Sequence, residues 1–188
     1  ALGDDRPALL VGFPLFARAA VRIDFARGEV VLAPTGTKLA ARNASSIELT
    51  VEGTRILAPA TLEKDVARVQ IDTGSDASLL LHAPWAKAHG LPGDRPVVER
   101  RGHFGAGTEE STEIELTLGR LIFGSLRLSQ INAKIVAPPD DGAIAGLLGN
   151  GALASCRAVT IDASAGRLYL DPPCRPRPRR PPPRGGSE

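Results

Sequence analysis

The chain has 188 residues, of which 43% are hydrophobic, and this is enough for one domain with a hydrophobic core. It contains no run of 18 apolar residues, so no membrane-spanning helix is expected. The net charge of +2 comes from the C-terminus: removing five arginines and one glutamate after Asp171 leaves 18 basic and 20 acidic residues. The body of the chain therefore has no basic face that would indicate nucleic-acid binding.

The composition favours short strands joined by turns, because glycine (20) and proline (16) are frequent and aromatic residues make up only 4%. The chain begins at Ala1 and contains no methionine. We therefore expect a processed or truncated piece of a longer protein, and the lack of a visible signal peptide says nothing about the parent protein.

Taken in chain order, alternating apolar residues predict a hairpin within 1–34 and strands at 47–51, 56–58 and 67–71. A short helix is expected at 84–89, with Pro84 near its start and Gly90 after its end. A long hairpin with a glycine-rich tip is expected at 97–118, followed by a strand at 131–136, an apolar run at 144–149 and a hairpin at 159–170. The expected organisation is residues 1–34 as the end of a truncated lobe, 35–46 as a linker, 47–172 as one lobe, and 173–188 as a disordered Pro/Arg-rich tail.

The chain contains an internal repeat. Residues 21–34 align without gaps on residues 159–172, with identical residues at six of the fourteen positions. Upstream, the run 9–12 lies over 147–149 with a slip of one residue. The repeat predicts that 1–34 is the end of a preceding lobe similar to the one that follows it.

The most informative motif is Asp72-Thr73-Gly74-Ser75, which follows the apolar strand 69–71 and precedes three leucines at 79–81. Glycine permits a tight turn at this place, and flanking hydroxyl and N–H groups can hold the carboxylate ionised. A carboxylate placed between two buried segments is costly unless it has a function. The alternative is an ordinary turn that happens to contain an aspartate.

Over about residues 47–172, the chain resembles the pepsin/retropepsin type of aspartic peptidase. The resemblance lies in the order of four features: the Asp72 motif, a glycine-rich hairpin about 30 residues later, Leu147-Leu148-Gly149, and the closing hairpin. The resemblance implies an all-β, retropepsin-like barrel lobe with a β-hairpin flap and one short helix. It implies an aspartic endopeptidase that needs no metal or organic cofactor and acts on extended peptide or protein substrates.

The resemblance also implies residue roles. Asp72 would be the catalytic carboxylate, Thr73 would lock two active-site loops together, Gly74 would permit the turn, and Ser75 would hydrogen-bond the outer carboxylate oxygen. The substrate-binding flap tip would span Phe104 to Thr108, including Gly105, Ala106 and Gly107. Leu147, Leu148 and Gly149 would support the aspartate loop.

Two departures from the family pattern matter. Only one Asp-Thr-Gly is present, so the second carboxylate must come from a lobe upstream in the parent chain or from a second copy in a homodimer. The only tyrosine, Tyr169, lies in the last hairpin rather than in the flap. The alternative function is a non-catalytic lobe that binds peptides or acts as a scaffold.

Other candidates have simpler explanations. Asp24 and Asp162 fit turn positions, and Trp85 fits a core or groove wall. The histidines His82, His89 and His103 do not have the spacing of metal ligands. No Gly-x-Ser-x-Gly motif is present, and Gly105–Gly107 lacks the Lys-Ser/Thr of a phosphate loop.

Cys156 and Cys174 flank the last hairpin and fall nearly opposite each other across its mouth, within disulfide reach. A disulfide there predicts a periplasmic or secreted protein. Two unrelated free thiols are the alternative, and a cytoplasmic location is not excluded by the sequence.

Overall fold

The structure is a computed structural model, and it describes residues 11–103, 110–137 and 143–175. Its helices are α1 (Phe13–Phe16), α2 (Ala83–Ala88) and α3 (Asn150–Leu153). Its strands are β1 (Ala19–Asp24), β2 (Glu29–Pro34), β3 (Ser45–Glu48), β4 (Thr50–Glu52), β5 (Arg55–Leu62), β6 (Asp65–Asp72), β7 (Leu79–His82), β8 (Val97–His103), β9 (Glu110–Phe123), β10 (Leu126–Val136), β11 (Gly146–Gly149), β12 (Ala158–Asp162) and β13 (Arg167–Asp171). The expected all-β fold is confirmed.

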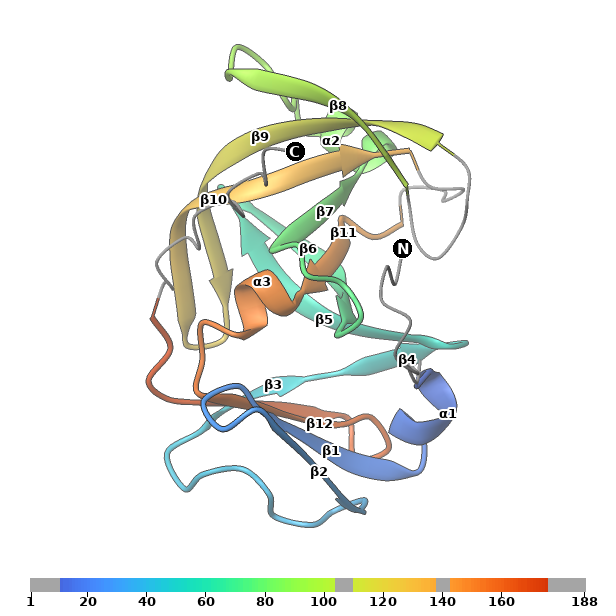
Figure 1. Ribbon diagram of the computed structural model, residues 1–188, viewed down its shortest axis with the longest axis vertical. Helices are drawn as coiled ribbons and strands as arrows, with labels where there is room; N and C mark the ends of the chain where they lie inside the picture. Colours follow the sequence, from blue (N-terminus) through green and yellow to red (C-terminus); the bar gives the residue numbers. More distant parts are fainter. Residues whose placement is uncertain (1–10, 104–109, 138–142, 176–188) are drawn as a thin grey trace, which may run out of the picture.

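The strands form two sheets (Figure 1). The larger sheet has eight strands in the order β4-β5-β6-β11-β7-β10-β9-β8, and β5 also pairs with β9, which closes the sheet on itself. The smaller sheet has the order β2-β1-β12-β13-β3 and lies below the first in Figure 1. The first hairpin of the chain is therefore joined to the last hairpin, although more than a hundred residues separate them in sequence.

Strand β6 shows how alternating side chains build the core of the larger sheet. In β6, Ala67, Val69 and Ile71 are buried, whereas the residues between them are half-buried or exposed. This period of two places every second side chain on the same face. The same hydrophobic core contains the largest fully buried side chains, among which are Leu62, Leu79, Leu81, Leu118, Leu121, Phe123, Leu126 and Leu148.

Strand β11 is inserted between β6 and β7. It runs parallel to β6, with Leu148 opposite Ile71 and Gly149 opposite Asp72, and antiparallel to β7. Glycine is required at its first residue, because a Cβ on Gly146 would lie 1.8 Å from the carbonyl oxygen of Leu80. Gly146 thus lets the backbone of β11 approach that of β7 closely.

The two repeated hairpins adopt the same register. Val21 pairs with Leu32 in the first hairpin, and the aligned residues Val159 and Leu170 pair in the second. Strands β1 and β12 pair antiparallel, with Arg22 opposite its aligned residue Thr160. A local two-fold axis at this pair therefore relates the two hairpins.

The relation extends to the helices that precede the hairpins. Both α1 and α3 are four residues long, and each follows a glycine in extended conformation, Gly12 and Gly149. The sequence predicts one short helix, and α2 confirms it within one residue. Helices α1 and α3 were not predicted, because a single turn is too short to show a helical period.

The aspartates of the two turns, Asp24 and Asp162, are both buried and use turn chemistry as expected. Burial raises the pKa of Asp24, but hydrogen bonds from the N–H groups of Arg27 and Ala26 and from Arg22 outweigh it, so the pKa lies below its ordinary value.

Asp162 shows the same balance. Burial raises its pKa, while hydrogen bonds from the Thr35 hydroxyl and the N–H groups of Gly36 and Ala165 lower it to below the ordinary value. The predicted linker is therefore attached to the second hairpin at its first two residues.

The predicted disulfide is present between Cys156 and Cys174. The predicted hairpin 97–118 is also present, formed by β8 and β9 with Val97 opposite Leu116. Its tip from Phe104 to Thr108 lies outside the described residues, as does the tail from residue 176. No helix within the described ranges is long and apolar enough to cross a membrane.

Candidate active site

The candidate active site is the turn that follows β6. Asp72 is the last residue of that strand and lies opposite Gly149, at the place where β6 and β11 end together. The chain then turns away through residues 73–78 before β7 begins. Asp72 and Thr73 are half-buried, so the carboxylate is held by the sheet but remains accessible to solvent.

The backbone of the turn holds the carboxylate. The Gly74 N–H donates a hydrogen bond of 2.9 Å to Asp72 Oδ1. A Cβ on Gly74 would lie 3.2 Å from the same oxygen, so glycine allows the close approach. The Ser75 N–H donates to the backbone oxygen of Asp72 at 3.3 Å.

The Ser75 hydroxyl has a different partner from the one that the resemblance implies. Its oxygen accepts a hydrogen bond of 3.3 Å from the Ala77 N–H. It therefore stabilises the turn itself, and among the described hydrogen bonds none joins this hydroxyl to the Asp72 carboxylate.

Residues 149–151 bind the backbone of the turn 73–78. The N–H groups of Gly149, Asn150 and Gly151 donate to the carbonyl oxygens of Ser78, Ser75 and Ala77. The side-chain Nδ2 of Asn150 donates to the Thr73 carbonyl oxygen at 2.6 Å. The segment Leu147-Leu148-Gly149 thus lies beside Asp72. The next two residues, Asn150 and Gly151, also bond the turn.

The two glycines in this segment leave no room for a side chain. A Cβ on Gly149 would lie 2.4 Å from the Ala77 carbonyl oxygen, and one on Gly151 would lie 2.6 Å from the Ser78 nitrogen. The sequence Gly-Asn-Gly therefore allows backbone-to-backbone contact between the turn and the start of α3.

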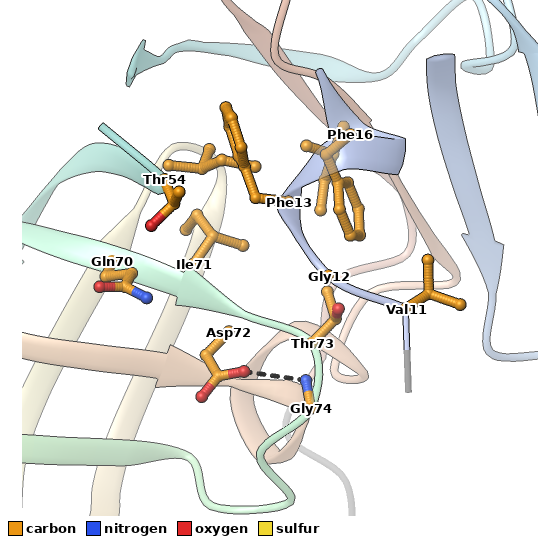
Figure 2. A pocket seen from close by; sticks show the side chains of 12 residues that line it. Val11, Gly12, Phe13, Phe16, Thr54, Gln70, Ile71, Asp72, Thr73 and Gly74 are labelled. Carbon is orange, nitrogen blue, oxygen red and sulfur yellow. Dashed lines mark hydrogen bonds between the residues drawn. The ribbon is translucent and has the colours of Figure 1, made fainter. Parts of the chain in front are cut away.

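Asp72 also borders a pocket of about 230 Å³. Figure 2 shows Asp72, Thr73 and Gly74 on one side of it, and Phe13 and Phe16 of α1 on another. The pocket is lined by Val11, Gly12, Phe13, Phe16, Thr54, Ile56, Gln70, Ile71, Asp72, Thr73, Gly74 and Ile161. Residues 11–16 come from the segment that precedes the first hairpin.

The segment 11–16 was not predicted as part of the site. The signal that indicates it is the alignment of residues 9–12 on 147–149, because 147–149 lies next to Asp72. The one-residue slip obscures this signal. The structure places both members of the repeat near the same carboxylate, α3 beneath the turn and α1 across the pocket.

Chemically, the site offers one carboxylate at a solvent-accessible turn, with Gly74 bound to Oδ1. Across the described ranges, no group of three or more His, Cys, Asp or Glu side chains is placed to hold a metal ion. Trp85 lies away from this pocket, where it is buried and stacks on His89 with ring centroids 3.9 Å apart.

Solved structures similar to this chain include the following two. One is a retropepsin-like aspartic protease from Rickettsia conorii, with 18% sequence identity, a TM-score of 0.48, and coverage of 69% of this chain and 96% of that chain. The chain is similar in structure to retropepsin-like aspartic proteases. The other is the EIAV protease in complex with the inhibitor HBY-793, with 12% identity, a TM-score of 0.36, and coverage of 54% of this chain and 88% of that chain.

No protein-family model matches the chain. No curated protein matches it significantly.

Proposed function

We propose that this chain is the Asp72-bearing lobe of an aspartic endopeptidase, and that it acts on extended peptides together with a second lobe. The observation that carries the proposal is the position of Asp72, at the end of a buried strand and held by a glycine N–H beside a pocket. The motif and its place in the fold agree with the family resemblance.

The proposed chemistry requires two carboxylates. Hydrolysis without a covalent intermediate needs a base to activate water and an acid to polarise the scissile carbonyl. Two carboxylates within hydrogen-bond distance share one proton and supply both roles, because like charges so close together cannot both ionise. Asp72 is one of them, and the pair would titrate as a unit.

The local two-fold axis supports a position for the second carboxylate. The turn 73–78 packs on residues 149–151 at the start of α3. The axis relates α3 to α1, and α1 faces Asp72 across the pocket. A second aspartate turn that packed on α1 in the same way would approach Asp72 from the opposite side.

The pairing of β12 favours a linked lobe over a homodimer. In this chain, β12 is paired on one side with β13 and on the other with β1. A second copy that used the same edge of β12 would have to displace β1. We therefore propose that residues 11–34 belong to the second lobe, which lies upstream in the parent protein, and we keep the homodimer as the alternative.

The β8–β9 hairpin is proposed to act as the flap. It lies at the top of the larger sheet in Figure 1, where β8 is the edge strand. A hairpin at such an edge can close on a bound peptide. Residues Phe104, Gly105, Ala106 and Gly107 at its tip would bind the extended substrate through backbone hydrogen bonds. The Cys156–Cys174 disulfide supports a periplasmic or secreted location.

The test is cleavage of casein, an unstructured substrate, between about pH 3 and 7, with and without pepstatin. The wild-type chain is compared with Asp72→Asn and with the matched control Asp65→Asn, which changes the aspartate at the other end of β6. Molecular mass is measured by light scattering in the same buffer.

Pepstatin-sensitive cleavage that is lost in Asp72→Asn and retained in Asp65→Asn would support the peptidase. If the active species is a dimer, Asp72 pairs with itself. A monomer without activity would be expected if the second carboxylate lies upstream, and restoring the upstream lobe should then restore cleavage. Cleavage unaffected by Asp72→Asn, or an inactive two-lobed protein, would contradict the proposal and favour the non-catalytic lobe.

A further inference from the structure

We propose that Asn150 is a positioning residue for Asp72, acting through the peptide group between Thr73 and Gly74. This inference rests on the proposed function for its catalytic consequence, but its structural part can be tested without activity. Asn150 is the first residue of α3, and its side chain reaches back to the turn that carries the aspartate.

One peptide group connects the two side chains. The Asn150 Nδ2 group donates to the Thr73 carbonyl oxygen at 2.6 Å. The N–H of the same peptide group belongs to Gly74 and donates to Asp72 Oδ1 at 2.9 Å. A trans peptide is planar, with its C=O and N–H pointing in opposite directions. Fixing the carbonyl therefore also fixes the direction in which the N–H points.

The two hydrogen bonds also reinforce each other electronically. A donor on the carbonyl oxygen polarises the peptide and makes its N–H a stronger donor, by about 10–30% per bond in hydrogen-bonded chains. The relay from Asn150 to Asp72 thus holds the carboxylate group in one orientation. Among the described hydrogen bonds, none involves the second carboxylate oxygen of Asp72.

The Asn150 side chain is used here as a donor. Its Oδ1 atom is buried and has no hydrogen-bond partner among the described residues. A buried acceptor without a partner destabilises the folded state by about 1–3 kcal/mol. The Asn150 side chain therefore carries a cost in stability that its N–H hydrogen bond must offset. The backbone contacts of residues 149–151 hold the turn as a whole. Within the described part of the chain, the Asn150 side chain alone donates to the Thr73 carbonyl.

The first test is made on the unmodified chain. NMR of the isotope-labelled protein should show a scalar coupling across the hydrogen bond between Asn150 Nδ2 and the Thr73 carbonyl carbon. It should also show a Gly74 amide proton shifted downfield and protected from exchange. Absence of the coupling would overturn the proposal without any variant.

The second test compares Asn150→Ala with the nearly isosteric Asn150→Asp, which keeps the shape but loses the N–H donor at neutral pH. Both should move the Gly74 amide upfield and raise its exchange rate about 10-fold, the effect of one lost hydrogen bond. The control Asn43→Ala changes an exposed asparagine and should leave Gly74 unchanged.

The outcomes distinguish positioning from packing. If Asn150→Asp retains the Gly74 signal while Asn150→Ala loses it, the side chain acts by filling space and the proposal is wrong. It is also wrong if both folded variants retain the signal.

In an assembly that cleaves peptides, both variants should lower kcat about 100-fold while KM changes little, because the aspartate is misplaced and the substrate groove is intact. Lack of cleavage by the two-lobed wild-type protein would contradict the proposed function and leave the NMR result unaffected.

Discussion

The first and last hairpins of this chain are two copies of one element in different surroundings. Residues 19–34 and 158–171 share their register, their turn aspartate and a glycine with positive φ, Gly28 or Gly166. Yet Leu170 is fully buried, whereas its aligned residue Leu32 is 52% exposed. The difference in exposure between these leucines therefore reflects what packs on each hairpin, because the two hairpins themselves are alike.

The covering of the second hairpin is visible in the structure. Strand β3 pairs with β13, and Ile47 on β3 lies close to Leu170 beside the β9–β10 turn. On the first hairpin, β2 is the edge of the sheet, and Val30, Val31 and Leu32 are exposed. Exposed apolar residues on an edge strand indicate a surface for pairing. A second lobe bound there would make the two hairpins equivalent.

The largest effect is expected from the matched substitutions Leu170→Ala and Leu32→Ala, which test whether the two hairpins differ in how they are covered. The first change removes fully buried methyl groups and should cost about 2–5 kcal/mol of unfolding free energy. The second removes a half-exposed side chain and should cost about 0.5 kcal/mol or less. Urea unfolding of both variants measures the difference. Equal losses would mean that β2 is covered in solution, for instance by a second copy of the chain.

A smaller effect is expected from the two turn aspartates. Asp162→Asn should cost about 1–3 kcal/mol, because an amide cannot accept all the hydrogen bonds from Thr35, Gly36 and Ala165. Asp24→Asn should be destabilising through the same loss of charge-assisted bonds at the first turn. Thermal unfolding at pH 7 ranks the two variants.

These carboxylates also predict a pH dependence. The pKa of each lies below its ordinary value of 3.8, so the folded state binds the proton less tightly than the unfolded chain does. Their contribution to stability is complete above about pH 5 and is lost as the pH falls below 4 through the native pKa. Unfolding curves between pH 2 and 7 should show a weaker acid dependence in the double Asn variant, and an unchanged slope would refute this assignment.

The smallest effect is expected at the turn glycines, a feature that the two hairpins share. Gly28 and Gly166 have φ angles of +69° and +64°, and a Cβ at either would meet no atom closer than 3.6 Å. Replacing either with alanine should cost about 1 kcal/mol through backbone strain alone. Chemical denaturation should give equal losses, and a much larger loss at one site would reveal a difference between the turns that the matched φ angles do not predict.

Much of the fold could be predicted from local patterns. The strand at 67–71, the hairpins at 97–118 and 159–170, and the short helix that contains Pro84 all appear in the structure. Local rules suffice there, because side-chain period and turn residues act within a few positions of the chain. The single strand predicted at 47–51 is wrong, because the chain breaks at Leu49 into β3 and β4, which belong to different sheets. The single-turn helices α1 and α3 escaped prediction, since four residues do not complete a recognisable period.

The candidate site was predicted only in part. Asp72 and Gly74 were identified from the motif, and their hydrogen bond follows from the tight turn. The predicted partner of the Ser75 hydroxyl differs from the observed one, Ala77. Asn150 was missed, because nothing in a linear pattern indicates that a residue 77 positions away donates to the Thr73 carbonyl. The α1 residues were missed, because the one-residue slip obscures the alignment of 9–12 on 147–149.

By itself, the sequence determined the strand pattern, the aspartate turn and the repeat, because each depends on spacing along the chain. The pairing of β1 with β12 at the aligned residues Arg22 and Thr160 is seen in the tertiary structure alone. The same is true of the position of α1 across the pocket from Asp72. These contacts join segments more than fifty residues apart. Their free energy comes from burial and hydrogen bonds formed when the segments meet, which no local preference specifies.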